Sequence, residues 1–127
     1  MVHIISDTTA SLPPEAVARF HLPIIPQIIH LGGQSYREGL DLNTETFLRL
    51  LRNEKGIPRT AAPPPQYFTE VFSQLVQDGE PIICIHPSSE VSGTVRSALL
   101  AAEEFPDADI RVWEFLCSQQ GRTHRTR

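Results

Sequence analysis

The feature that most constrains the fold is the alternation of short apolar runs with stretches of helical periodicity. Residues 2–5, 81–85 and 110–113 are apolar at nearly every position, as buried parallel strands are. Between the last two runs, the segment 95–105 repeats apolar side chains at helical spacing, and residues 66–77 do the same before the second run. The order of strand, helix and strand predicts an α/β fold with a mainly parallel sheet and flanking helices.

Residues 23–66 are less regular. The two prolines in the run PIIPQIIHL, residues 23–31, limit its first half to an edge strand or an extended segment. The Gly-Gly pair that follows predicts a tight turn, after which residues 34–39 can return as a short second strand. We expect a helix over residues 45–54 and, because three prolines follow one another there, a loop over residues 56–66.

Composition narrows the possible partners. The chain has 127 residues, enough for one domain, with a formal net charge of −4 and a hydrophobic content of 40%. An acidic chain without clustered basic residues is not expected to bind nucleic acid or an anionic membrane surface. We expect no signal peptide, no transmembrane segment and a cytoplasmic location, with Cys84 as a buried core thiol and no disulfide to Cys117.

The last ten residues differ in composition from the rest. Residues 118–127, SQQGRTHRTR, contain three arginines but neither an acidic nor an apolar side chain. We expect a folded domain over residues 1–117 and a basic tail over residues 118–127 that is disordered or frameshifted. A basic interaction tail is the alternative, and three arginines give it thin support.

A hydroxyl-rich turn follows the apolar run PIICI. Ser92, Gly93 and Thr94 stand between this predicted strand and the helix over residues 95–105. The first N–H groups of a helix have no partner within it, and the helix dipole is positive there. Ser92 can cap the helix and Gly93 lets a ligand approach the backbone, so the turn suits a carboxylate or a phosphate. The alternative is that Ser92 caps the helix and binds nothing.

The sequence offers little support for catalysis. It contains neither a G-x-S-x-G nucleophile motif nor a phosphate-binding loop, and Lys55 is the only lysine. The five histidines show no metal-ligand spacing, and we expect His86, at the end of a strand, to be structural or to lie at the rim. Asp7 follows the first strand, where some α/β enzymes bind Mg²⁺ or accept a phosphoryl group, but SDTTAS lacks a second acid. We expect Asp7 to bond loop hydroxyls and backbone.

Three segments in order resemble the DegV family of fatty-acid-binding proteins. IISDTTASLPPEAV is similar to the family's strand-D-S-T-x-D-L-P start, and PRTAAPPPQYF to its P-T-S-Q-P-S loop. SSEVSGTVRSALLAAE is close to its S-x-x-L-S-G-T-Y-x-S-A motif. The stretch IIPQIIHLGGQSYREGLDLNTETFLRLL also fits, so the resemblance runs through residues 1–113.

The resemblance implies a ligand and its contacts. The family's carboxylate-binding hydroxyls correspond to Thr60 and Ser92, with the backbone of Gly93 and Thr94 helping to hold the head group. It implies a long-chain fatty acid presented to a separate ATP-dependent fatty acid kinase in the cytoplasm. The chain itself would carry no catalytic residue, metal or cofactor. The rival hypotheses are a phosphotransfer or hydrolase enzyme that uses Asp7 and the 92–94 turn, and an inactive truncated fragment.

The chain departs from the family pattern in three places. The Ser-Gln pair of the loop is Ala61-Ala62, and the Tyr of the third motif is Val95. After IRVWEF, the family continues into a second domain, whereas this sequence ends in LCSQQGRTHRTR. We therefore expect an isolated N-terminal domain that is truncated or frameshifted near Trp113. Its open half-site would expose apolar surface that favours self-association.

Overall fold

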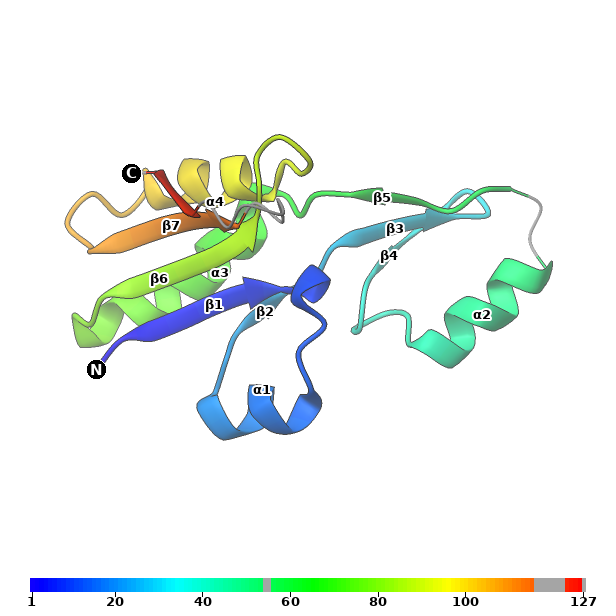
Figure 1. The fold of residues 1–127 in the computed structure, drawn as a ribbon, viewed down its shortest axis with the longest axis horizontal. Helices are drawn as coiled ribbons and strands as arrows, with labels where there is room; N and C mark the ends of the chain where they lie inside the picture. The colour runs from blue at the N-terminus through cyan, green and yellow to red at the C-terminus, as the bar shows by residue number, and fades with distance from the viewer. Residues whose placement is uncertain (54–55, 116–122, 127) are drawn as a thin grey trace.

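A five-stranded sheet with the order β2-β1-β6-β7-β8 forms the larger layer of the molecule (Figure 1). The computed structural model describes residues 1–53, 56–115 and 123–126, and side chains up to residue 115. The strands are β1 (His3–Asp7), β2 (Ile24–Ile25), β6 (Ile82–Pro87), β7 (Ile110–Phe115) and β8 (Thr123–Thr126). The first four are parallel and β8 is antiparallel to β7, which confirms the predicted α/β class with a mainly parallel sheet.

Two helices cover one face of this sheet and form the core with it. They are α3 (Pro65–Leu75), continued by the short turn η2 (Val76–Asp78), and α4 (Thr94–Ala102). Buried side chains alternate along the strands, so Ile5, Cys84 and Val112 face Phe68 and Phe72 of α3. Burial raises the pKa of the Cys84 thiol to about 12, so this cysteine is an inert core residue, as predicted.

A small antiparallel sheet extends from the carboxyl ends of the parallel strands (Figure 1). Its strands are β3 (Ile28–Leu31), β4 (Gln34–Arg37) and β5 (Arg59–Ala61). Gly32 and Gly33 join β3 and β4 with positive φ angles, as the sequence predicted. The sequence predicts a loop over residues 56–66, and this prediction is wrong for residues 59–61, which form β5. The proline run begins only after β5, so the backbone of β5 is free to pair with β3.

Two more helices lie away from α3 and α4. They are α1 (Pro14–Phe20), which follows the turn η1 (Thr8–Ala10), and α2 (Thr44–Asn53), close to the predicted helix 45–54. In the view of Figure 1, α1 lies below β2 and α2 lies near the small sheet. None of the side chains described in α1 or α2 is fully buried. Both helices instead turn half-buried residues such as Val17 and Phe47 toward a cavity between them.

The other face of the large sheet is open. Ile4, Ile85 and Phe115 alternate with the core residues of their strands, and 39%, 43% and 55% of their surfaces are exposed. No helix within residues 1–53, 56–115 and 123–126 is long and apolar enough to cross a membrane.

The basic C-terminal segment is described only in part. Its residues Thr123–Thr126 form β8 and pair with β7. The expected disorder or frameshift therefore remains a prediction for residues 118–122 and 127, which lie outside the described residues, as Cys117 does.

Candidate functional site

The Ser-Gly-Thr turn lies where β6 leads into α4, at the carboxyl end of the parallel sheet (Figure 1). The sequence suggests that Ser92 caps α4, but the N-cap residue of this helix is Gly93. Ser92 is held one position earlier, because its N–H donates to the carbonyl of Ser88 at 3.0 Å. Its hydroxyl still serves the helix, since Oγ accepts the N–H of Thr94 at 3.3 Å and lies 2.8 Å from Thr94 Oγ1.

A buried acid–imidazole pair lies beside this turn. Asp7 ends β1 and His86 is near the end of β6, so the neighbouring parallel strands bring their side chains together. His86 Nδ1 donates to Asp7 Oδ2 at 2.5 Å, and the two residues are 2% and 1% exposed. The imidazole and the Phe68 ring pack in a T-shaped arrangement, with centroids 5.2 Å apart. His86 is thus structural, as predicted, and is not a rim residue.

The carboxylate of Asp7 is fully engaged. Its Oδ1 accepts the N–H and hydroxyl of Thr9 and the amide of Gln27, while Oδ2 accepts from His86. Burial alone would raise the pKa of Asp7, but the hydrogen bonds from His86 and Thr9 outweigh it and hold the pKa below 3.8. Three of these donors are on Oδ1 and one is on Oδ2, so both oxygens of the carboxylate are hydrogen-bonded within the protein. Asp7 thus bonds loop groups, as predicted, and its geometry does not favour the phosphotransfer alternative.

Gln27 connects this pair to the turn. Its side-chain nitrogen lies 3.3 Å from Asp7 Oδ1 and 3.0 Å from Thr94 Oγ1, and the residue is buried. The sequence analysis missed both this residue and the Asp7–His86 contact. The available signal was an amide alone inside the apolar run PIIPQIIHL, because a buried polar side chain requires a partner.

A cavity of about 660 Å³ opens between α1, α2 and the small sheet. Thr60 of β5 and Thr8 of η1 lie in its wall, and Glu38 is held there by a 2.5 Å hydrogen bond from Thr8. The rest of the wall is mainly apolar, with Leu12, Val17, Ile24, Ile29, Leu42 and Phe47. Its size is that of a small-molecule site.

The segment that carries Thr60 reaches the Ser-Gly-Thr turn. A Cβ atom placed on Gly93 would lie 3.3 Å from the Cβ of Ala62, so the two backbones are in close contact. Thr60 is two residues before Ala62 in the sequence, and Ser92 is one residue before Gly93. The segments that carry Thr60 and Ser92 therefore lie next to each other, but of the predicted site residues only Thr60 is among those that line the cavity. Thr94 is fully buried, and its hydroxyl faces Gln27 and Ser92.

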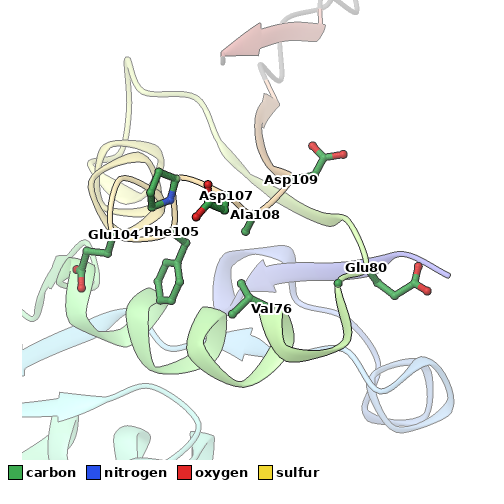
Figure 2. Close-up of a pocket in the computed structure, with 9 residues that line it drawn as sticks. Val76, Glu80, Glu104, Phe105, Asp107, Ala108 and Asp109 are labelled. Carbon is green, nitrogen blue, oxygen red and sulfur yellow. The ribbon is translucent and has the colours of Figure 1, made fainter.

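Another cavity, of about 460 Å³, lies at the amino ends of the strands, between the end of α3 and the connection from α4 to β7 (Figure 2). Its wall contains four acidic residues, Glu80, Glu104, Asp107 and Asp109. This charge opposes a carboxylate or a phosphate, so we do not associate this cavity with the predicted ligand. Among the described side chains, no three His, Cys, Asp or Glu residues are grouped so that they could hold a metal ion.

The comparison with known families decides what kind of protein carries this site. The profile described as "Uncharacterised protein, DegV family" matches residues 1–123. The chain belongs to the DegV family. A DegV domain-containing protein of Clostridium perfringens is 32% identical over 111 residues, which are 87% of this chain and 40% of the relative.

Solved structures of DegV proteins share the fold. A fatty acid-binding DegV family protein from Thermus thermophilus gives a TM-score of 0.78 at 28% identity, over 89% of this chain and 40% of that one. A stearic acid-binding protein from Eubacterium ventriosum gives a TM-score of 0.79 at 30% identity, over 88% and 40%. The chain thus spans about two fifths of the length of these DegV relatives.

Proposed function

We propose that this chain binds a long-chain fatty acid, with the carboxylate at the Ser-Gly-Thr turn and the acyl chain in the apolar cavity. The observation that supports the proposal is the close approach of Ala62 to Gly93, because Thr60, two residues before Ala62, lines the cavity. The fatty-acid ligands named for the related structures support the same class of ligand.

The apolar wall supplies most of the affinity. Each methylene removed from water contributes about 0.8 kcal/mol, so about a dozen of them give a gross gain near 10 kcal/mol before ordering costs. Leu42 and Ile29 are already buried against this space, while Phe47 and Val17 are half-buried and can close on a chain.

The charged and polar groups of the site determine where the carboxylate end of the fatty acid binds. Glu38 stands in the cavity wall beside Thr8, so a second carboxylate there would be repelled. At the turn, the hydroxyls of Ser92 and Thr60 and the backbone of Gly93 offer donors next to the positive end of α4. Thr94 acts through Ser92, because its own hydroxyl is buried.

The bound acid is, in this proposal, presented to a separate ATP-dependent fatty acid kinase in the cytoplasm, and the chain itself is not an enzyme. This role follows from the resemblance to the DegV family, and the engaged carboxylate of Asp7 is consistent with it. It predicts that phosphorylation of the acid by such a kinase requires this chain or its full-length relative.

The experiment is titration of the chain with palmitate, followed by native mass spectrometry and by calorimetry. Ser92→Ala removes a hydrogen bond to a charged group, which contributes about 1.5 to 3 kcal/mol, so the affinity should fall about tenfold or more. Ser89→Ala is the matched control, because Ser89 lies on the same loop and only its backbone N–H has a described partner, Glu114. Equal affinities of the two variants, or no palmitate bound to the wild type, would overturn the proposal.

A further inference from the structure

The helix α1 forms one side of the proposed acyl cavity and is weakly attached to the rest of the molecule. Leu12, Pro14 and Val17, which lie in or next to this helix, line the cavity. Figure 1 shows α1 set apart from the large sheet, with the chain running back toward the sheet from both of its ends. A helix in this position controls access to the cavity if it can move.

The hydrogen bonds around α1 are all local. Within the part of the chain that the structure describes, no hydrogen bond or ion pair joins residues 12–22 to a residue outside this range. The last of them, Leu22, donates its N–H back to the carbonyl of Val17 at 3.0 Å. The next residue, Pro23, is already anchored, because its carbonyl accepts the N–H of Ser6 at 3.2 Å. Polar contacts thus hold the segment only at its two ends.

The packing of α1 is equally sparse. Of residues 11–22, only Ala16, Val17 and Leu22 are half-buried, and the others are exposed. A helix of seven residues is marginal in water unless tertiary packing stabilises it, and α1 buries no side chain fully, whereas α3 buries two phenylalanines. Segments with few buried contacts are those that open locally while the rest of a protein stays folded.

A residue with left-handed backbone stands at each end of α1. Ser11 precedes the helix with a φ angle of 47°, and His21 ends it with a φ angle of 49°. This conformation is unfavourable for a residue other than glycine, because the Cβ atom crowds the backbone. A rotation at these two positions would relieve that crowding and swing α1 away from the cavity, as hinge residues do in other proteins.

We propose that α1 is a lid, which opens about Ser11 and His21 in the free chain and closes on the acyl chain of a bound fatty acid. The inference rests on the proposed function, which supplies the ligand. When α1 is open, Leu12 and Val17 no longer wall the cavity, so a long apolar chain can enter from the side. When the chain is bound, these side chains lose contact with water against it, and this burial favours the closed state.

Hydrogen exchange followed by mass spectrometry, with and without palmitate, tests the lid. In the free chain, the amide hydrogens of residues 16–22 should exchange at least about 100-fold faster than those in the middle of α3. Saturating palmitate should slow them about tenfold or more. Protection of α1 equal to that of α3 in the free chain would overturn the inference, and so would bound palmitate that leaves the exchange of α1 unchanged.

Glycine variants test the hinges. Ser11→Gly combined with His21→Gly removes the cost of the left-handed backbone, so residues 16–22 of the free chain should exchange about threefold more slowly. Ala18→Gly is the matched control. Ala18 is exposed in the middle of α1, where glycine weakens a helix, so exchange should become about fivefold faster.

A change in the same direction in both glycine variants would overturn the assignment of the hinges. The exchange rates of the free chain require no fatty acid. A wild type that binds no palmitate would therefore refute the proposed function, while the rates of the free chain still decide whether α1 opens.

Discussion

The pair of Asp7 and His86 illustrates how single residues define this site. A carboxylate at 1% exposure is costly unless each of its oxygens is hydrogen-bonded, and here His86, Thr9 and Gln27 provide those bonds. The result is a fixed, ionised group next to the ligand turn which is not itself available to a ligand. It therefore helps to position Ser92, to which it is connected by hydrogen bonds through Gln27 and Thr94.

This pair makes the stability of the fold depend on pH. The pKa of Asp7 in the folded chain lies below 3.8, so its contribution is present above that value and is lost as the pH falls through the folded pKa. We expect Asp7→Asn to lower the free energy of unfolding at pH 7 by about 1.5 to 3 kcal/mol and to flatten its loss below pH 4. Urea unfolding between pH 3 and pH 7 measures both effects. Asp107→Asn, an exposed aspartate, is the control, and equal curves for the two variants would contradict the prediction.

At the scale of elements, the sequence predicts the helices and strands that have a long apolar pattern. The helix α3 follows from apolar residues at helical spacing, and the strand β6 from the near-continuous apolar run over residues 81–85. Strand β5 has only three residues and stands next to a proline run, so its pairing with β3 depends on tertiary structure that no local pattern reveals.

The proposed site depends on the sequence in a similar way. Ser92 and Thr60 are proposed from the DegV motifs, and the expectation that a strand-to-helix turn binds an anion comes from helix physics. The supporting residues could not, because Gln27 and His86 meet Asp7 only across strands that are far apart in sequence. A buried amide in an apolar run indicates that a partner exists, but it does not identify that partner.

The contact between β5 and the start of α4 gives a prediction at this scale. In Gly93→Ala the new methyl group would lie 3.3 Å from the Cβ of Ala62, so the two segments must separate slightly. We expect the affinity for palmitate to fall by about 1 kcal/mol, with little loss of stability. Gly33→Ala should lower the stability and leave the affinity for palmitate unchanged. The φ angle of Gly33, 76°, disfavours alanine, although no atom lies within 4 Å of the new methyl group. Calorimetry and urea unfolding of both variants check this, and a loss of affinity in Gly33→Ala alone would refute it.

For the whole molecule, the open face of the large sheet is the main liability. Ile4, Ile85 and Phe115 expose apolar surface on neighbouring strands, whereas the helices α3 and α4 cover the opposite face. An apolar patch of this kind favours association with another surface.

We expect the chain as given to self-associate in a concentration-dependent way. Ile85→Lys should weaken this association, because it places a charge in the middle of the open face, whereas Ile57→Lys should not, because Ile57 is 88% exposed on a loop. Sedimentation equilibrium over a range of concentrations distinguishes the variants. A monomer at every concentration, or equal effects of both substitutions, would show that the face is not the cause.

The two prolines that flank β2 have a consequence for how such association can proceed. Pro23 and Pro26 have no N–H groups, and they leave β2 only two residues long at the outer edge of the large sheet. An incoming strand would find few donors there, so the sheet cannot easily be extended at this edge. Strand addition next to β2 is therefore disfavoured, so association at this end of the sheet would proceed face to face rather than edge to edge.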